Sequence, residues 1–409
     1  MSRPKKQSHS ELLQLCKDRG LKGCTALKKA QLVERLAESS STSIQEPSFV
    51  YQPMITYLGN KRKLVPWIME IIQSIYNQFD GKPLRMFDAF AGSGVISRAL
   101  MPFCYELHSN DMELYSYILL RCFLETPTPS QKEQILFHFQ TITDYCQTHS
   151  QIGFITKLYS PLQTSSPQPN ERCFYTRENA ILIDTILYYI FNYVTSDLQH
   201  YLLGPLLIKS SINVNTAGVF RGFYKKNGIG HFGGNGENAL ERILATIQPS
   251  LPIWSTYPCK SFCYNSDILT LLPTFSDKYF DIIYLDPPYN EHPYGSNYFM
   301  LNLIASNQEP TEYSRISGIP KEWNKSTFNG RNSVFESMLQ LLKLSIQKSQ
   351  IVLLSYNDEG LISEEDWIKI WNELKCSPKI FKKSYDTYHG SRNLSSRNKT
   401  VYEILYLIS

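Results

Sequence analysis

Apolar residues along the chain follow two alternating patterns. Short apolar runs with the length of buried strands alternate with segments whose apolar residues recur at helical spacing. Strands are predicted at 84–90, 106–110, 262–265, 280–285 and 350–356. Helices are predicted at 66–76, 93–101, 112–123 and 363–374. This alternation predicts an α/β fold with a doubly wound, mostly parallel sheet, whose ligands bind at the carboxyl ends of the strands. Two final runs, 379–385 and 401–408, are expected to pair antiparallel.

The alternation stops between about 124 and 255, a stretch long enough to form its own lobe. At the other end, residues 8–38 read as two short helices, and Ser8-His-Ser-Glu11 is a capping box. Residues 39–48 are polar and predict a flexible linker. The expected organisation is a helical module at 1–38, a linker at 39–48, an α/β domain from 49–123 and 256–409, and an inserted lobe at 124–255.

Composition restricts the class of protein. Of 409 residues, 42% are apolar and 19% are charged, as in soluble globular proteins. The chain has no apolar run of about 18 residues, so no membrane span is expected, and its basic N-terminus lacks the apolar stretch of a secretory signal. Nine cysteines occur without a C-x-x-C pair. Reduced thiols in a cytoplasmic protein without a metal site are therefore predicted.

Positive charge is concentrated near the N-terminus. Residues 1–38 hold nine Lys or Arg and four Asp or Glu, a net +5 in a chain whose total is +4, which leaves −1 for the rest. A basic module beside a nearly neutral body indicates an appended element that binds a polyanion.

A glycine-containing turn follows the first predicted strand of the α/β domain, in the segment Phe87-Asp-Ala-Phe-Ala-Gly-Ser-Gly94. Because Gly92 and Gly94 lack a Cβ atom, a ligand can lie against their backbone. Asp88, at the end of the strand, is suited to a ligand ammonium group. Asp111 ends the next strand, where a carboxylate can accept hydrogen bonds from ribose hydroxyls. Position 97 is Ser rather than the third glycine of a dinucleotide motif, which favours a shorter adenosyl ligand.

A second motif, Asp286-Pro-Pro-Tyr289, follows the most apolar of the predicted strands. The lone pair of an exocyclic amino group is delocalised into its base, so the group is a poor nucleophile. Two acceptors on its N–H bonds, the Asp286 carboxylate and the Pro287 carbonyl, would favour a pyramidal nitrogen with a free lone pair. Pro287 and Pro288 stiffen the turn, which preorganises the acceptors. Tyr289 offers a face for stacking, and a base in a duplex reaches such a pocket only by flipping.

These two motifs, preceded by Tyr57-Leu-Gly-Asn-Lys61-Arg-Lys-Leu64, resemble the Dam-type class of DNA adenine-N6 methyltransferases. The resemblance implies a Rossmann-like methyltransferase fold with an inserted target-recognition lobe, and S-adenosylmethionine as the methyl donor. It places Tyr57 and Lys61 at the methionine end of the cofactor, and Asp267 and Ile268 at its adenine. The cofactor-binding residues expected on this basis are Tyr57, Lys61, Asp88, Phe90, Gly92, Gly94, Asp111, Asp267 and Ile268.

The N-terminal helices resemble the SAP-type DNA-binding module, through the segments 12–21 and 27–32. Lys28 and Lys29 lie in the first turn of the second helix, where cations oppose the helix dipole. A phosphate docked at that N-terminus would explain them. A helical hairpin used for packing or dimerisation is the alternative.

Three further basic residues, Arg221, Lys225 and Lys226, lie in a segment of the inserted lobe that mixes cations, aromatic residues and glycines. Such a segment is suited to contacts with phosphate or guanine, although an ordinary glycine-rich connection has the same composition. Arg392 and Arg397 lie in a basic stretch near the C-terminus, which is either a phosphate clamp or a solvated loop.

The resulting prediction is a site-specific methyltransferase acting on adenine N6 in double-stranded DNA. The resemblance implies a role in restriction–modification, with a nuclease for the same site as a candidate partner and a DNA-associated cytoplasmic monomer as the default state. Three alternatives stay open. Two change the acceptor, to cytosine N4 or to adenine in RNA, because the acceptors of the Asp286 motif can bind the exocyclic amino group of either base. The third is a noncatalytic DNA-binding subunit.

Overall fold

A computed structural model describes residues 28, 31, 47–51, 55, 59–234, 236–386 and 400–409. The chain divides into two compact units, Met1–Val50 and Tyr51–Ser409, and α3 (Pro47–Tyr51) is the first helix that can be described. Apart from Lys28 and Gln31, the predicted helices at 8–38 lie outside the described residues. Lys28 is exposed, and its backbone N–H donates to the Gln31 side chain at 2.9 Å.

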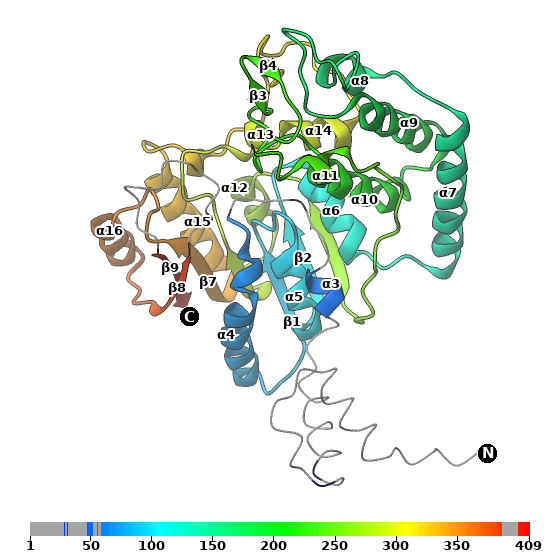
Figure 1. Ribbon diagram of the computed structural model, residues 1–409. Helices are drawn as coiled ribbons and strands as arrows, with labels where there is room; N and C mark the ends of the chain where they lie inside the picture. Colours follow the sequence, from blue (N-terminus) through cyan, green and yellow to red (C-terminus); the bar gives the residue numbers. More distant parts are fainter. Residues whose placement is uncertain are drawn as a thin grey trace, which may run out of the picture. The chain divides into compact units, whose positions relative to one another are not determined.

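A seven-stranded sheet forms the centre of the second unit (Figure 1), in the order β5-β2-β1-β6-β7-β9-β8. Its strands are β1 (Leu84–Asp88), β2 (Cys104–Asn110), β5 (Lys260–Tyr264), β6 (Phe280–Leu285), β7 (Ser349–Asn357), β8 (Lys379–Asp386) and β9 (Thr400–Ile408). The first five strands of the order pair parallel, and the last two pair antiparallel. The predicted fold class and the antiparallel closing pair are therefore confirmed.

Strand β1 lies at the point where the strand order changes direction. The chain continues from β1 outward to β2 and β5, and then returns to β6 on the other side of β1. In doubly wound sheets, such a switch point opens a crevice at the carboxyl ends of the strands. The register pairs Asp88 with Tyr284, which brings the start of the glycine motif beside the start of the Asp286 motif.

Helices flank the sheet in two layers (Figure 1). One group comprises η2 (Lys61–Lys63), α4 (Val65–Gln78), α5 (Val95–Leu100), η3 (Met101–Phe103) and α6 (Leu114–Leu124). The other comprises α12 (Ile268–Leu271), η4 (Leu272–Thr274), η5 (Thr327–Asn329), α15 (Val334–Lys348) and α16 (Glu364–Leu374), whose apolar residues share a buried cluster with β1, β6 and β7. Helix α15 was not among the predicted helices, although Val334, Met338, Leu341 and Leu342 recur at helical spacing.

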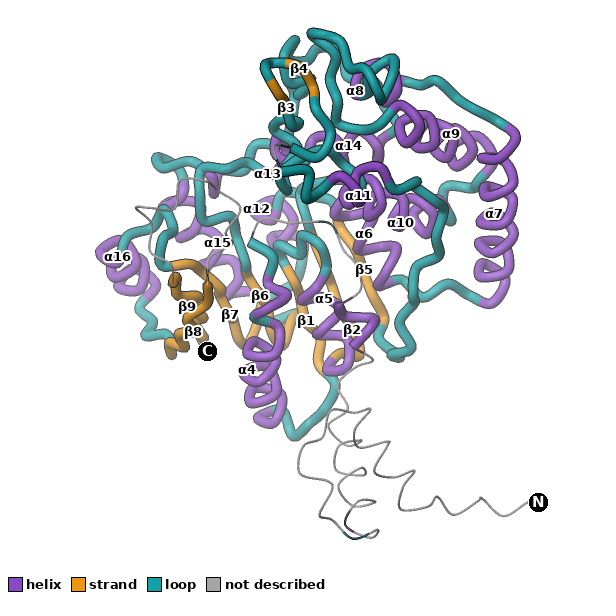
Figure 2. The backbone as a smooth tube through the Cα atoms, viewed as in Figure 1, coloured by secondary structure: helices purple, strands orange, loops and turns teal. Residues whose placement is uncertain are grey.

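The region 124–255 consists of helices joined by long loops, with one small hairpin (Figure 2). It contains α7 (Pro129–Thr148), α8 (Phe154–Tyr159), α9 (Arg177–Tyr193), α10 (Gln199–Ile212), β3 (Lys225–Lys226), β4 (Ile229–Gly230) and α11 (Leu240–Leu244). Two later helices, α13 (Tyr294–Asn297) and α14 (Phe299–Ser306), lie against them. One buried cluster runs through this lobe into α6 and α14, so the lobe is anchored to the sheet domain by a shared core.

The contact between α10 and α6 depends on a glycine. A Cβ atom at Gly204 would lie 2.5 Å from Cys122 Sγ and 2.7 Å from Cys122 Cβ. We expect Gly204→Ala to lower the free energy of unfolding by about 2 kcal/mol, because a methyl group added to a filled core forces neighbours apart. Chemical denaturation followed by circular dichroism would measure this.

The added substitution Cys122→Gly should restore part of the loss, since it removes both the sulfur and the Cβ atom that clash. Gly222→Ala is the control, because a Cβ there meets nothing within 4 Å. A Gly204→Ala variant as stable as the wild type would contradict this account of the α6–α10 contact.

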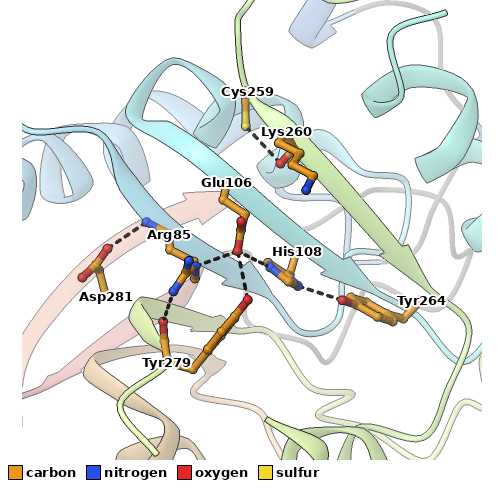
Figure 3. Close-up of polar contacts among 8 residues, drawn as sticks. All are labelled: Arg85, Glu106, His108, Cys259, Lys260, Tyr264, Tyr279 and Asp281. Carbon is orange, nitrogen blue, oxygen red and sulfur yellow. Dashed lines mark hydrogen bonds and ion pairs between the residues drawn. The ribbon is translucent and has the colours of Figure 1, made fainter. Parts of the chain in front are cut away.

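A polar network crosses four strands of the sheet (Figure 3). Its side chains are Arg85, Glu106, His108, Tyr264, Tyr279 and Asp281. Glu106 Oε1 accepts from Arg85 Nε at 2.6 Å and lies 3.0 Å from His108 Nε2. His108 Nδ1 lies 2.9 Å from the Tyr264 hydroxyl. The network thus ends at the last residue of β5, directly before the loop that carries Asp267, and supports the position of that loop.

Candidate active site

An open pocket of about 760 Å³ lies at the carboxyl ends of β1, β2, β5 and β6. This volume includes space open to solvent, and a concavity at the carboxyl ends of the strands is the usual ligand site of a doubly wound sheet. Eight predicted site residues line it: Phe90, Asp111, Asp267, Ile268, Asp286, Pro287, Pro288 and Tyr289. The cofactor motif and the amino-binding motif, which are almost 200 residues apart in the sequence, therefore meet in one cavity.

The glycine turn is held by left-handed backbone and by Asp111. Gly92 and Gly94 have φ angles of 52° and 74°, a region that side chains with a Cβ atom rarely occupy. The Gly92 N–H donates to Asp111 Oδ2 at 2.8 Å. Neither glycine lines the pocket directly. The turn instead packs behind Phe90 and Asp111, which do.

Asp88 is buried beneath this turn. Its Oδ2 accepts a hydrogen bond from Ser97 Oγ at 2.6 Å, and its Oδ1 has no hydrogen-bond partner among the residues that the structure describes. Burial raises the pKa of Asp88 to about 7, although Ser97 opposes the shift. An oxygen that is buried without a partner is costly, and a cationic group of a ligand would satisfy it.

Asp111 shares its wall of the pocket with a second carboxylate. Both Asp111 oxygens accept backbone hydrogen bonds, Oδ2 from Gly92 and Oδ1 from Glu113 at 2.9 Å. Burial raises the pKa of Asp111 to about 6 and that of Glu113 to about 7. Glu113 was missed by the sequence analysis, and its only sequence signal is its place two residues after Asp111. Its Oε2 accepts from Asn302 Nδ2 at 2.5 Å.

Another part of the lining comes from the loop after β5 and from η5. Asp267 caps α12, and its side chain accepts from the Leu269 N–H at 2.8 Å. Ile268 is buried beneath it. The rings of Phe90 and Phe328 meet edge to face with centroids 5.3 Å apart. This combination of two aromatic rings, an aliphatic side chain and a carboxylate suits an aromatic heterocycle that carries an amino group.

Asp286 lies in a buried ion-pair cluster. Its Oδ1 is 3.0 Å from Lys61 Nζ, and the same ammonium lies 2.6 Å from Glu403 Oε1. Burial raises the pKa of Asp286 to about 7; Lys61 opposes this shift and Glu403 adds to it. Burial also acts to lower the pKa of Lys61, but Asp286 and Glu403 bring it well above its ordinary value. The ammonium is therefore charged.

Two tyrosines complete this end of the pocket. The Lys61 ammonium lies 5.7 Å from the centroid of the Tyr289 ring. A Cβ atom at Gly59 would lie 3.2 Å from the Tyr294 hydroxyl and 3.5 Å from that of Tyr289, so the two hydroxyls converge on this glycine. Its φ angle of 72° is in the left-handed region, which gives two reasons for glycine here.

The structure does not bring every predicted site residue to the pocket. Lys61 does not line it but holds Asp286 from behind. Arg221, Lys225 and Lys226 are exposed, the last two on the hairpin formed by β3 and β4. The hairpin turn places Asn227 and Gly228 at φ angles of 52° and 83°, as a two-residue hairpin requires. Lys29, Tyr57, Arg392 and Arg397 lie outside the described residues.

The segment before the hairpin is joined to the pocket region. The Phe220 N–H donates to the Asn297 carbonyl at 2.7 Å, and Asn297 ends helix α13, which begins at the pocket residue Tyr294. The basic residues therefore follow directly from the rim of the cavity.

Comparison with known proteins gives a consistent result. The family described as D12 class N6 adenine-specific DNA methyltransferase matches residues 57–369. The Type II methyltransferase M.CviAII of Paramecium bursaria Chlorella virus 1 is 31% identical over 329 residues, which cover 79% of this chain and 89% of the relative. The Type II methyltransferase M.NlaIII of Neisseria lactamica is 28% identical over 317 residues, 76% of this chain and 85% of the relative.

A longer relative, the modification methylase StsI of Streptococcus sanguinis, is 30% identical over 367 residues. The match covers 86% of this chain but 51% of that protein, so the chain corresponds to about half of it. Within the described residues, no helix is both long and apolar enough to cross a membrane.

Proposed function

The chain belongs to the D12 class of N6 adenine-specific DNA methyltransferases, and we propose that it transfers the methyl group of S-adenosylmethionine to an adenine at a specific site in duplex DNA. The observation that supports this most directly is the position of Asp286. One of its oxygens is held by Lys61, in a pocket that also contains the carboxylates and aromatic rings suited to an adenosyl ligand.

The pocket residues supply what the amino group needs. With Oδ1 of Asp286 held by Lys61, Oδ2 is directed to one N–H bond of the adenine amino group, and the Pro287 carbonyl accepts the other. Both acceptors draw the nitrogen toward a pyramidal geometry, which frees its lone pair for attack on a methyl group. Tyr289 provides the stacking face. Since the pocket is a cavity in the protein, we propose that the adenine flips out of the duplex to enter it.

The buried polar groups match the parts of S-adenosylmethionine. When bound, this cofactor supplies an electrophilic methyl group on a sulfonium. In our proposal, the unpartnered Oδ1 of Asp88 faces the ammonium group of its methionine part. Asp111 accepts from the ribose hydroxyls, and Asp267 with Ile268 and Phe90 holds the adenine. Tyr57 and Lys61 are proposed to complete the methionine end.

The experiment that tests this function uses purified protein, unmethylated plasmid and S-adenosylmethionine. After digestion to nucleosides, mass spectrometry should detect N6-methyldeoxyadenosine. Detection of N4-methyldeoxycytidine would instead favour the cytosine alternative, and methylation of RNA alone would favour the RNA alternative. Absence of every methylated base, with DNA binding retained, would identify a noncatalytic subunit.

We propose that the β3–β4 hairpin contacts DNA, since Lys225 and Lys226 are exposed at its tip and Arg221 is exposed just before it. Replacing both lysines with alanine should weaken DNA binding about tenfold. It should also reduce the slope of log affinity against log salt by about 2, because each phosphate contact contributes about 0.9 to that slope. Fluorescence anisotropy across a salt series would measure both.

The control for the hairpin is Lys82→Ala, which removes another exposed lysine, paired with Asp80 at 3.6 Å. Equal salt slopes for the hairpin variant and the wild type would exclude the hairpin as a phosphate contact.

The finer features of the proposal concern partners. Lys28 and Lys29 are proposed to add nonspecific DNA affinity, and Arg392 and Arg397 to contact phosphates. The relatives M.CviAII and M.NlaIII are named as Type II methyltransferases. We therefore propose a monomer in a restriction–modification system, with a nuclease that reads the same site, acting on DNA in the cytoplasm.

A further inference from the structure

The ion-pair cluster behind the Asp286 motif contains two carboxylates, those of Asp286 and Glu403, but one ammonium group, that of Lys61. Lys61 and Glu403 are almost fully buried, with side-chain exposures of 5% and 0%, and the Asp286 side chain is 17% exposed. Two carboxylates share a single ammonium, so this cluster carries a net negative charge. A neutral pair of Lys61 and Asp286 would have sufficed to fill the same space.

Glu403 reaches this cluster from an unexpected place. It lies on β9, 342 residues after Lys61, where it pairs in register with Asn357 of β7. Its Oε1 accepts hydrogen bonds from both Lys61 Nζ and the Ser355 hydroxyl. Its Oε2 has no hydrogen-bond partner within the described part of the chain. A buried carboxylate with one unsatisfied oxygen costs stability, so stability alone does not account for its presence.

Its effect on Asp286 offers an account. An acceptor oxygen binds an amino proton more strongly when its electron density is not withdrawn by a nearby cation. If Lys61 faced Asp286 alone, the ammonium would neutralise the carboxylate and weaken it as an acceptor. With Glu403 drawing the ammonium to 2.6 Å, against 3.0 Å for Asp286, Lys61 still orients Asp286 but neutralises it less.

We propose that Glu403 is a positioning residue for methyl transfer, which shares the Lys61 ammonium so that the free oxygen of Asp286 stays a strong acceptor for the amino group of the target base. This inference rests on the proposed function. It assigns a role to a residue on the last strand of the sheet, which touches neither the base nor the cofactor.

The test is the variant Glu403→Gln, which keeps the shape and removes the charge. We expect kcat to fall about tenfold, with the KM for DNA close to that of the wild type. The acid limb of the pH–rate profile should move to lower pH, because Glu403 no longer raises the pKa of Asp286. The other charged or titratable groups around Asp286 are Lys61, Asp88, Tyr284, Tyr289 and Tyr294, and all are retained.

A matched control is Glu373→Gln, which removes a carboxylate that is also 2.6 Å from a lysine nitrogen, that of Lys343, but at the surface. It should leave the profile unchanged. A merely structural role for Glu403 would lower the amount of active enzyme without moving the acid limb. A Glu403→Gln profile that matches the wild type after scaling would overturn the proposal.

A second variant guards against misfolding of the first. Lys61→Met combined with Glu403→Leu replaces the ion pair by apolar groups, an exchange that folded proteins often tolerate. Lys61 opposes the upward pKa shift of Asp286 more strongly than Glu403 adds to it. The acid limb of the double variant should therefore move to higher pH, opposite to Glu403→Gln. An unmoved limb would overturn the proposal.

A measurement without DNA separates this inference from the proposed function. Carbon NMR of protein labelled at the aspartate carboxyl carbons, with Asp286 assigned through Asp286→Asn, reports its titration directly. A lower pKa of Asp286 in Glu403→Gln supports the charge sharing even if the wild type methylates no DNA, in which case the proposed function alone fails. An unchanged pKa rejects the charge sharing whatever the activity.

Discussion

Replacing Asp286 with alanine is expected to slow DNA methylation by about a thousandfold or more, while the affinities for DNA and for S-adenosylmethionine stay within a few fold of the wild type. A preorganised acceptor in a site shielded from water is worth several kcal/mol in the transition state, and Asp286 is the acceptor directed at the reacting nitrogen. Because the proposed contribution of Asp286 arises as the nitrogen attacks, the loss should appear in kcat rather than in KM.

The fold should survive this substitution. Lys61 keeps Glu403 as a partner at 2.6 Å, so the ammonium does not become an unpaired buried charge. Single-turnover methylation measures the chemical step, and calorimetry measures cofactor binding. Asp144→Ala, an exposed aspartate on α7 that accepts from Gln140 at 3.2 Å, is the control. A kcat within about tenfold of the wild type would remove Asp286 from the centre of the mechanism.

Activity and stability are expected to change in opposite directions as the pH falls from 8 to 6.5. The pKa of Asp286 is raised to about 7, so acidification protonates the acceptor and activity falls. For a group with this pKa, the ionised fraction at pH 5.5 is about thirtyfold lower than at pH 8, and kcat/KM should follow it.

The free energy of unfolding should rise as the pH falls, because burial in the folded protein disfavours the ionised form of these carboxyl groups. Burial raises the pKa to about 7 for Asp88, Glu113 and Asp286, and to about 6 for Asp111, all above the ordinary values of 3.8 for Asp and 4.5 for Glu. Between pH 8 and 6.5, the folded protein takes up protons that the unfolded chain does not. The free energy of unfolding should therefore rise by roughly 2–3 kcal/mol over this interval.

Below about pH 6.5 two histidines oppose part of this gain. Burial lowers the pKa of His108 and of His200, so the unfolded chain binds their protons first, and stability should rise less steeply with further acidification. Thermal unfolding without ligands tests the predicted rise in stability, and kcat/KM measured in the same buffers tests the predicted fall in activity. Stability that falls from pH 8 to 6.5 would contradict the buried carboxyl shifts, and activity that stays flat would contradict the role of Asp286.

The sheet could be predicted from the sequence because its strands are coded locally. Strands β1 and β6 are buried along most of their length, so each is mainly apolar and is interrupted only by Arg85 or Asp281. Asp88 and Asp286 mark the carboxyl ends of these strands. The turn after β1 could also be predicted from its glycines, because a left-handed backbone conformation favours glycine over residues with a Cβ atom. Helix α15 was not predicted, although its apolar residues recur at helical spacing and its sequence therefore contains the signal.

The ion-pair cluster could not be predicted in the same way. Glu403 lies in an apolar strand, β9, where one carboxylate gives no pattern, and its partner Lys61 is hundreds of residues earlier. Glu113 was not predicted as a site residue, although it lies two positions after Asp111. Sequence spacing alone does not tell which of two nearby carboxylates faces a cavity. Lys61 was expected beside the cofactor from resemblance, and the structure shows its ammonium between two carboxylates.

By itself, the sequence determined the α/β class, the ends of the central strands, and the place of the Asp286 motif at one of those ends, because each depends on residues that are neighbours in the chain. Only the tertiary structure decided the strand order, the shared core that anchors the inserted lobe, and the meeting of Lys61, Asp286 and Glu403. Those features come from contacts between segments that are distant in the sequence. The free energy of such contacts depends on burial and on the distances between charges, and neither can be inferred from a local sequence pattern.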